Sequence, residues 1–327
     1  MVLPRKAALL SLVAVAPLAL AGCASGEADA GPSTSAETIE VTDNFGTQTV
    51  PSPPQSVVAT DNRTFETLAD WGVELSAGAV ALMPSTNPYT EDESIVDIGT
   101  HNEPDLEAVV AAEPDLIING QRFATFREDF QSLAPDAAIV ELDPREGEPL
   151  DEELKRQVTV LGEIFDRQEE AEALVADLDA AIERVTAAYD AADSVLAVTV
   201  SGGEIGYLAP GVGRTLGPLY DILGLSPAVE VDDASDDHQG DDISVEAIAD
   251  SNPDWILVMD RDAAVAAGDS SYEPAAEVLE SSEALAGVPA VEQDQIVYMP
   301  ADTYTNEGIQ TYTEFLETFA DALESAR

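Results

Sequence analysis

Cysteine, histidine and basic residues are all scarce in this sequence. The 327-residue chain holds one cysteine, two histidines and 13 lysines and arginines, against 65 aspartates and glutamates, which gives a formal net charge of −52. A single cysteine forms no internal disulfide and no thiol-rich metal site. A surface this acidic repels nucleic acids and anionic lipid headgroups. The shortages therefore exclude nucleic-acid binding, and we take most of the acidic residues as solvated surface.

Signatures of common enzymes and metal sites are missing as well. The sequence has no G-x-S-x-G, no H-E-x-x-H and no phosphate-binding glycine loop, and no base lies near Ser201-Gly202-Gly203 in sequence. The acidic stretch 232–242, DDASDDHQGDD, lacks the terminal glutamate of a calcium loop. We therefore predict that the protein is not an enzyme. A divalent-metal receptor that uses this stretch with His101 is a less favoured alternative, and so is a surface lipoprotein with a purely structural role.

Residues 1–22 have the three regions of a bacterial export signal. A basic start is followed by an apolar run from Ala7 to Leu20 and by small residues before Cys23. The run is too short and wrongly flanked for a membrane-spanning helix. The LAGC motif that ends at Cys23 resembles a bacterial lipobox, which implies cleavage before this cysteine and its lipidation, on the outer face of the cell membrane. Residues 23–38 are small and polar and predict a flexible tether.

Two segments of the sequence follow the same pattern. Residues 106–122 read LEAVVAAEPDLIINGQR, and residues 245–261 read VEAIADSNPDWILVMDR. Each predicts a short helix that begins on a glutamate, a Pro-Asp break and a buried strand, with an arginine just past the strand end. Ligands of open parallel sheets bind beyond the carboxyl ends of the strands. Two similar α/β units with one such arginine each, Arg122 and Arg261, predict an anion held between two lobes.

The length and the hydrophobic content, 45% of the residues, are sufficient for two domains. Strand and helix patterns alternate over residues 39–150 and again over residues 193–327, which favours two α/β lobes, the first with a parallel sheet. Over residues 151–192, apolar residues recur every three or four positions, which predicts helices. A break near Asp166 leaves a second helix at 168–191, and this helix is long enough to bridge the lobes.

Four segments of the chain carry a resemblance to a known family. In chain order they are GTHNEPDLEAVVAAEPDLIINGQR, YLAPGVGRTLGPLYDILG, ISVEAIADSNPDWILVMDRD and IVYMPADTYTNEGIQ. With these segments the chain resembles the lipid-anchored substrate-binding proteins of ABC importers for ferric siderophores, in particular the branch that takes catecholate siderophores. The resemblance implies a class III periplasmic-binding-protein fold, with two Rossmann-like lobes joined by a single long α-helix. It also implies a monomer, without an intrinsic cofactor, that delivers its ligand to an ABC permease and its ATPase for iron uptake. The wider superfamily leaves a hydroxamate siderophore, haem or cobalamin as alternative ligands.

The resemblance also implies five ligand-binding residues. Arg122, Arg214 and Arg261 would line the cleft between the lobes and face the anionic iron complex. Guanidinium groups suit this role, because they are always charged and offer forked donors and flat faces for stacking on aromatic rings. His238 and Tyr304 would bind the siderophore-bound Fe(III) directly when the siderophore is tetradentate.

The sequence departs from the family pattern next to both predicted iron ligands. Gln239 separates His238 from the glycine that usually follows it, and Thr305-Asn306-Glu307 replaces a glycine-rich segment after Tyr304. A shift of one residue would turn either side chain away from the iron. A solvated histidine and an aromatic lid are the corresponding alternatives, and we take His101 as structural.

Glu107 and Glu246 occupy the same place in the two repeated segments. The resemblance implies that they project from the two lobes towards arginine pockets on the permease. Their placement near the starts of paired helices also fits a simple interaction with the helix dipoles, worth about 0.3–1 kcal/mol. Because a symmetric placement fits a symmetric permease dimer, we prefer docking for both.

Overall fold

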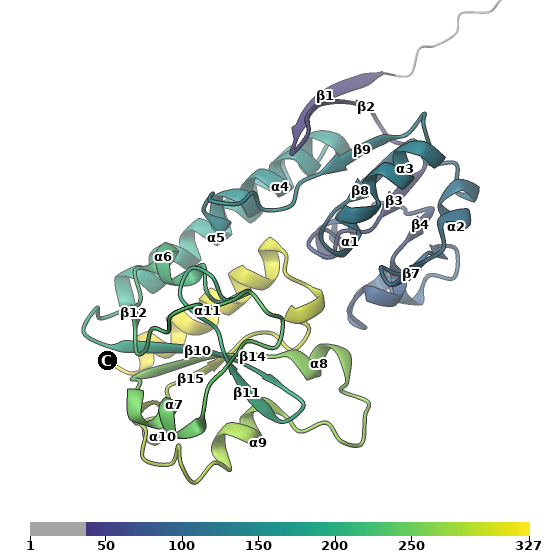
Figure 1. The fold of residues 1–327 in the computed structure, drawn as a ribbon. Coiled ribbons are helices and arrows are strands. Elements are labelled where there is room, and N and C mark those ends of the chain that lie inside the picture. The colour runs from purple at the N-terminus through teal and green to yellow at the C-terminus, as the bar shows by residue number, and fades with distance from the viewer. Residues whose placement is uncertain (1–36) are drawn as a thin grey trace, which may run out of the picture. The chain divides into compact units, whose positions relative to one another are not determined.

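The computed structural model describes residues 37–327. The predictions for the export signal, for Cys23 and for most of the tether lie outside these residues. Within 37–327, no helix combines the length and the apolar character that crossing a membrane requires. The chain forms two main β-sheets, each with its own helices, and a pair of helices lies between them in sequence (Figure 1).

The first lobe contains a five-stranded sheet in the order β5-β4-β3-β8-β9. All neighbouring strands in it run parallel, as the alternating pattern predicted. Parallel strands are covered on both faces and read as continuous apolar runs, and every residue of β8, LIIN, is buried. The strands are β3 (Val57–Ala59), β4 (Ala77–Gly78), β5 (Val96–Asp97), β8 (Leu116–Asn119) and β9 (Ala138–Glu141). The helices are α1 (Phe65–Asp70), α2 (Leu106–Ala111) and α3 (Arg127–Leu133), with the 3-10 helices η1 (Val80–Leu82), η2 (Pro88–Glu91) and η3 (Gln121–Phe126).

Two antiparallel hairpins accompany this sheet. The first pairs β1 (Thr38–Asp43) with β2 (Gly46–Pro51), and the second pairs β6 (Gly99–Thr100) with β7 (Glu103–Pro104).

The second lobe contains a six-stranded mixed sheet. Its order is β13-β11-β10-β14-β15, and β12 also pairs with β10. The central strands β10, β14 and β15 run parallel, whereas β11 and β13 run antiparallel to their neighbours. The strands are β10 (Ser194–Ser201), β11 (Glu204–Tyr207), β12 (Ser226–Pro227), β13 (Asp241–Asp242), β14 (Trp255–Asp260) and β15 (Ile296–Tyr298). The helices are α6 (Leu219–Leu223), α7 (Val245–Ser251), α8 (Arg261–Val265), α9 (Ala275–Glu280) and α10 (Pro289–Glu292), with the 3-10 helix η4 (Thr303–Thr305).

In both repeated segments, the aspartate of the Pro-Asp break accepts hydrogen bonds from residues at the start of the neighbouring strand. The Asp115 carboxylate accepts hydrogen bonds from the backbone N–H groups of Gln55 and Ser56, at 2.8 and 3.0 Å. The Asp254 carboxylate accepts from the backbone N–H and the hydroxyl of Ser194, at 2.7 and 2.9 Å. In each lobe the repeat therefore ties the start of its own strand to the start of the neighbouring parallel strand, which fixes where both strands end.

Two helices connect the lobes in sequence. α4 (Leu150–Phe165) and α5 (Gln168–Ala188) are separated at Asp166, whose φ of 56° ends α4 in the left-handed conformation. The predicted break near Asp166 and the predicted class III fold are confirmed; of the two connecting helices, α5 is the long one that leads into the second lobe. α5 ends at Ala188, three residues before the predicted position, because Tyr189 is extended. The C-terminal helix α11 (Ile309–Ser325) packs on α5, and Arg184 of α5 pairs with Asp321 at 2.6 Å.

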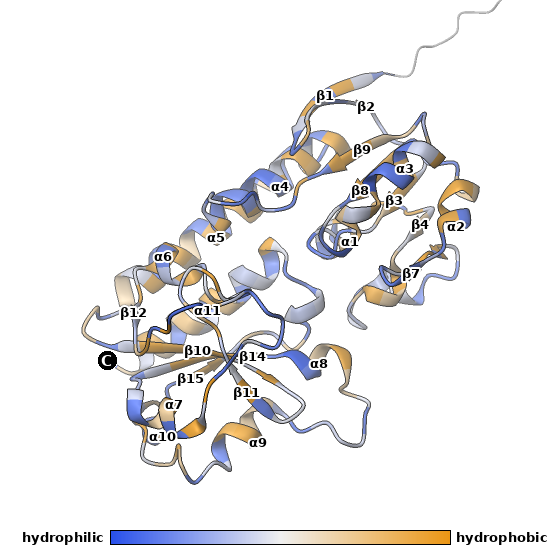
Figure 2. Ribbon diagram, in the orientation of Figure 1, coloured by the Kyte–Doolittle hydropathy of each residue, from blue (hydrophilic) through white to orange (hydrophobic). Residues whose placement is uncertain are grey.

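The central strands β10 and β14 of the second sheet are mostly hydrophobic (Figure 2), and successive side chains of β10 belong to different hydrophobic cores. Val195 and Ala197 of β10 belong to a core that is continuous with the connecting helices and the first lobe. Leu196 and Val198 point to the opposite face and belong to a separate core under α7 and α9. One face of the second sheet and the whole first lobe thus share a single apolar interior.

Several predicted helices in the second lobe are shorter than the sequence pattern indicated. In this lobe the sequence pattern predicts helices over 215–224, about 275–285 and about 306–323. In the structure, α6 begins at Leu219, α9 ends at Glu280 and α11 begins at Ile309. Before α6 the backbone turns tightly on itself. A Cβ on Gly217 would lie 2.2 Å from the Gly213 carbonyl oxygen, so this turn admits no larger residue there and holds no regular helix.

Leu178 is 1% exposed in α5, within the core shared by the two lobes. We expect Leu178→Ala to lower the free energy of unfolding by about 2–5 kcal/mol, because it removes buried methyl groups and leaves a cavity. The matched control is Glu172→Ala on the exposed side of the same helix, expected to stay within about 0.5 kcal/mol of the wild type. Urea unfolding followed by circular dichroism measures both, and equal effects would contradict the proposed core position of α5.

Candidate anion-binding site

Three arginines surround the ring of Tyr304. Their guanidinium carbons lie 5.1 Å (Arg122), 4.8 Å (Arg214) and 4.7 Å (Arg261) from the ring centroid. These are cation–π distances, and a tyrosine face attracts cations through its quadrupole. We call the three arginines and Tyr304 the arginine cluster. The sequence predicted all four as ligand-binding residues, and the structure brings all four together.

The strand ends position the cluster. Arg122 lies in η3, directly after β8, and Arg261 is the first residue of α8, directly after β14. Tyr304 lies in η4, which follows β15. Arg214 comes from the tight turn before α6. The carboxyl ends of parallel strands in open α/β sheets are where ligands bind, so the cluster occupies the expected edge of both sheets.

Burial and neighbouring cations act in opposite directions on Tyr304. The side chain is buried, at 8% exposure, and burial alone would raise the pKa of its phenol. The adjacent guanidinium groups of Arg261 and Arg122, followed by the charge of Arg214, lower this pKa below its ordinary value. The three arginines therefore stabilise negative charge on the Tyr304 oxygen relative to an exposed tyrosine, and the same electrostatics stabilise any anionic oxygen placed there.

The three arginines differ in their partners. Arg214 forms an ion pair with Glu307 at 2.7 Å, and Arg261 forms one with Asp262 at 3.1 Å. Within residues 37–327, Arg122 has no carboxylate at ion-pair distance; its Nη2 donates weakly to the Tyr304 carbonyl at 3.5 Å, and its Nη1 is buried without a hydrogen-bond partner. A buried donor without a hydrogen-bond partner lowers the stability of the folded state unless a ligand accepts a hydrogen bond from it.

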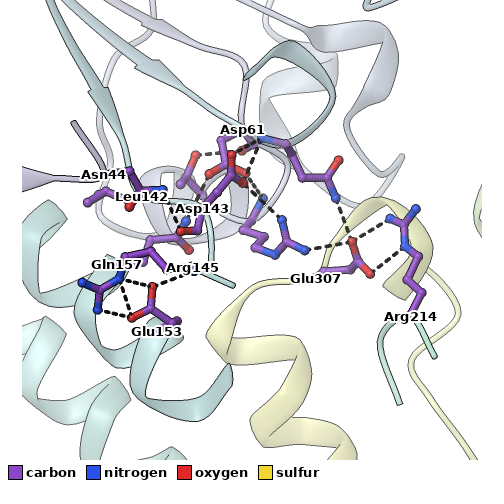
Figure 3. A network of polar contacts seen from close by, with 12 residues as sticks. Asn44, Asp61, Leu142, Asp143, Arg145, Glu153, Gln157, Arg214 and Glu307 are labelled. Carbon is purple, nitrogen blue, oxygen red and sulfur yellow. Dashed lines mark hydrogen bonds and ion pairs between the residues drawn. The ribbon is translucent and has the colours of Figure 1, made fainter. Parts of the chain in front are cut away.

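Glu307 links the arginine cluster to both lobes (Figure 3). Its side chain is 2% exposed and accepts hydrogen bonds from Gln121 at 2.8 Å and from the Thr215 hydroxyl at 2.6 Å. Arg214 contacts both oxygens of the Glu307 carboxylate, and the Arg63 Nη2 lies 3.6 Å from Oε2. Burial alone would raise the pKa of Glu307, but the two arginines hold it down at about 2.

Sequence reasoning missed Glu307 and Arg63. Glu307 was noticed only as part of a departure from the family pattern, and one more carboxylate in an acid-rich chain gives no signal. Arg63 lies four residues after the end of β3. Its position just past a strand, in a chain with few basic residues, is the one sequence feature that could have indicated a role in the site.

The segment that carries Tyr304 and Glu307 is also held by the first lobe. Asn62 donates to the Thr305 carbonyl at 3.0 Å, and Asn306 donates to Glu66 at 2.8 Å. Thr67 donates to Gln310 at 2.8 Å. These bonds cross from the first lobe to the C-terminal part of the chain, so Tyr304 is positioned by both lobes.

A second buried carboxyl lies behind the cluster. Asp61 is fully buried in the first lobe, and its carboxylate accepts hydrogen bonds from the backbone N–H of Arg63 at 2.9 Å and from Gln157 at 3.1 Å (Figure 3). Burial, reinforced by the nearby charge of Asp143, raises its pKa to about 7. Asp61 is thus the buried acid of this network that titrates near neutral pH.

The structure does not bring His238 to the arginine cluster. Its side chain is 48% exposed in the loop before β13, and its Nδ1 lies 3.8 Å from the Asp237 carboxylate. His101, which we took as structural, instead lies near Arg122. Burial, followed by the charge of Arg122, lowers the pKa of the His101 imidazole, and its Nδ1 has no hydrogen-bond partner.

Glu107 and Glu246 lie in the first turns of α2 and α7, and both are exposed. Each helix has a side-chain cap on its N-terminus, from Asp105 and Ser244 respectively. Glu246 also lines a surface pocket of about 720 Å³ together with Glu204, Asp242 and Glu273. Both glutamates are thus exposed side chains at corresponding positions of the two lobes.

No group of three or more histidine, aspartate or glutamate side chains is arranged to hold a metal ion within the described part of the chain. The acidic stretch 232–242, which includes His238, therefore offers no ready site for a divalent metal.

The fold and the site together define a two-lobed α/β protein with three arginines gathered around one tyrosine at the edges of both sheets. A family model described as periplasmic binding protein matches residues 57–303. The chain belongs to this family, and it is a binding protein and not an enzyme, as the sequence predicted.

The chain is also similar in sequence to individual proteins that are named for the siderophores they bind. The chain is 27% identical to the petrobactin-binding protein YclQ of Bacillus subtilis (strain 168), over 98% of this chain and 99% of that protein. It is 30% identical to the ferric-anguibactin-binding protein FatB of Vibrio anguillarum, over 69% of each chain. The crystal structure of YclQ has a TM-score of 0.73 against this structure, at 25% identity, and the match covers 88% of this chain and 99% of that one.

The raised pKa of Asp61 predicts how stability changes with pH. A carboxyl whose pKa is raised from 3.8 to about 7 on folding binds its proton more tightly in the folded state. Its contribution therefore favours folding below about pH 4 and is lost as the pH rises to about 7. We expect the free energy of unfolding of the wild type to fall over this range relative to that of Asp61→Asn.

Urea unfolding at half-unit pH steps measures this difference. Asp136→Asn, at an exposed position of the same lobe, is the control and should follow the wild type at every pH. A constant difference between wild type and Asp61→Asn from pH 4 to 7.5 would show that Asp61 is ionised throughout, contrary to its burial.

Proposed function

We propose that this chain is an exported, lipid-anchored binding protein that captures a ferric siderophore, preferably one with catecholate groups, and delivers it to an ABC permease and its ATPase for iron uptake. The observation that carries the proposal is the arginine cluster, with three guanidinium groups within 4.7–5.1 Å of one tyrosine ring. The names of the two curated relatives, one for petrobactin and one for ferric anguibactin, support a ferric siderophore as the ligand.

The chemistry of the ligand fits the cluster. Catecholate oxygens bound to Fe(III) leave an anionic complex with flat aromatic rings. Guanidinium groups interact with both parts, because they donate paired hydrogen bonds to anionic oxygen and stack on aromatic faces. Arg122 has a buried Nη1 atom without a partner, which a ligand oxygen would complete.

Of the two proposed iron ligands, Tyr304 is supported by its position. The lowered pKa of its phenol favours the phenolate that Fe(III) prefers, and a tetradentate siderophore leaves iron positions open for it. His238 remains proposed from the resemblance alone, and its loop has to move for the imidazole to reach the cluster.

The remaining parts of the proposal rest on the sequence. The export signal, residues 1–22, and the lipobox cysteine Cys23 support a location on the outer face of the cell membrane. Lipidation by more than one acyl chain gives a stable anchor. Glu107 and Glu246 are proposed to dock on the permease, and the acidic pocket beside Glu246 is suited to a basic side chain of that partner.

Ligand titration tests the proposal. The soluble domain, residues 24–327, is titrated with a ferric bis-catecholate, a ferric tris-catecholate, a ferric hydroxamate, haem and cobalamin, and quenching of intrinsic tryptophan fluorescence is followed. We expect saturable binding of a ferric catecholate. Arg122→Ala, Arg214→Ala and Arg261→Ala should each weaken it by about ten- to a hundredfold, the range for a lost hydrogen bond to a charged group.

Arg184→Ala is the control for these variants, because Arg184 pairs with Asp321 and Glu324 on α11. It should bind like the wild type. Binding of the hydroxamate, haem or cobalamin alone would replace the catecholate by that ligand, and no binding of any member of the panel would overturn the siderophore proposal.

Docking is tested separately from ligand binding. In cells whose iron supply depends on the full-length lipoprotein, Glu107→Ala combined with Glu246→Ala should lower iron uptake by about tenfold or more, as expected for lost interfacial ion pairs. The ligand affinity of the purified double variant should stay unchanged. Glu169→Ala combined with Glu172→Ala, at exposed positions of α5, removes the same charge and should leave uptake intact. Wild-type uptake by the docking variant would refute this role.

A further inference from the structure

We infer that Glu307 and Asp262 set the net charge of the arginine cluster, so that the site selects a ferric complex with one negative charge over a trianionic one. The inference rests on the proposed function and names the class of its ligand by charge. In this account Glu307 and Asp262 are specificity-determining residues.

Glu307 neutralises Arg214 through paired contacts to a carboxylate that is only 2% exposed to solvent. The two side chains make paired contacts, Nε to Oε1 at 3.2 Å and Nη2 to Oε2 at 2.7 Å. Thr215 donates to Oε1 at 2.6 Å, and Gln121 donates to Oε2 at 2.8 Å. Such paired, charge-assisted bonds to a buried carboxylate are strong and directional. The charge of Arg214 is thus paired with that of Glu307, and its side chain is held in a fixed orientation.

Asp262 does the same for Arg261. Its Oδ1 accepts from the Arg261 Nη1 at 3.1 Å, and its Oδ2 accepts from the backbone N–H of Gly202 at 2.5 Å. Ser201 contacts both members of the pair: its hydroxyl oxygen accepts from the Arg261 Nη1 at 3.2 Å, and its hydroxyl donates to the Asp262 Oδ1 at 3.4 Å. The backbone bond anchors Asp262 to the turn between β10 and β11, so this carboxylate is also fixed in place.

Arg122 is the member of the cluster left without a carboxylate among the described residues. Three guanidinium charges and two carboxylate charges leave one net positive charge around Tyr304. Arg63, the remaining nearby arginine, is shared between Glu307 and Asp143, at 3.6 and 3.4 Å. The count treats Tyr304 as a neutral phenol, and its ionisation would reduce the positive charge further.

One net positive charge is complementary to a monoanionic ligand. A trianionic complex would bring two charges without a counterpart into a partly buried site, where salt screens them little. Like charges placed close together across an interface cost several kcal/mol and are a common means of rejecting the wrong partner. The carboxylates of Glu307 and Asp262 would supply this repulsion.

A purely structural role for Glu307 predicts something different. Loss of a structural carboxylate would weaken the binding of all ligands to a similar extent, through a misplaced Arg214. Loss of a charge-setting carboxylate would change the ratio of affinities between ligands of different charge. The ratio therefore separates the two roles.

The test uses Glu307→Gln, which keeps the shape of the side chain and one acceptor oxygen. Dissociation constants are measured for a monoanionic ferric bis-catecholate and for a trianionic ferric tris-catecholate, at fixed pH and salt. We expect the wild type to prefer the monoanion. In Glu307→Gln the preference should shift towards the trianion by at least about tenfold, because two extra ligand charges respond to the lost carboxylate. Asp262→Asn should shift it in the same direction.

Glu317→Gln is the charge-matched control, since Glu317 is exposed on α11. It should leave the ratio unchanged. Circular dichroism and thermal melting establish that each variant is folded, and Asp262→Asn carries the test alone where the buried substitution prevents folding.

The outcomes separate this inference from the proposed function. Tighter wild-type binding of the trianion, or an unchanged ratio in the folded variants, would overturn the charge-setting role while the siderophore proposal stands. Absence of binding to every ferric complex would overturn both. A shift in Glu307→Gln and Asp262→Asn without a shift in Glu317→Gln supports the inference.

Discussion

The buried carboxylate of Glu307 is the interaction on which the arrangement of the site depends. A buried charge is costly unless it is paired and fully hydrogen-bonded. Here the partners come from both lobes, Arg63 and Gln121 from the first and Arg214 and Thr215 from the second. Displacing either lobe would leave a buried charge without its partners. The position of the lobes, the direction of Arg214 and the place of Tyr304 are therefore mutually dependent.

The internal repeat explains two of the three cluster arginines and not the third. Asp115 and Asp254 tie the strand starts of their lobes in the same way, so β8 and β14 deliver Arg122 and Arg261 to corresponding edges. Arg214 comes from a turn without a counterpart in the repeat. The site thus combines a pair of arginines at corresponding positions of the two lobes with a third arginine from a turn of the second lobe.

The features that could be predicted from the sequence were those with a local cause. Continuous apolar runs identified β8 and β14, and the repeat with the resemblance identified the cluster arginines. The helix expected over 215–224 was too long, because the close contact of Gly217 with the Gly213 carbonyl lies outside a periodicity argument. Glu307 could not be found, because its contact with Arg214 joins residues 93 positions apart. The position of His238 depended on loop geometry that no pattern encodes.

The chain carries a net charge of −52, so its distant carboxylates and its local arginines act in opposite directions on the anionic ligand that we propose. At about 0.15 M salt the Debye length is about 8 Å, so surface carboxylates act weakly on a ligand already in the site. They act more strongly on its approach, and the repulsion grows with the charge of the ligand. A trianion meets more of this repulsion than a monoanion, and then a cluster with one unpaired arginine. If Glu307 and Asp262 set the local charge as we infer, the long-range field and the local ion pairs favour the same ligand charge.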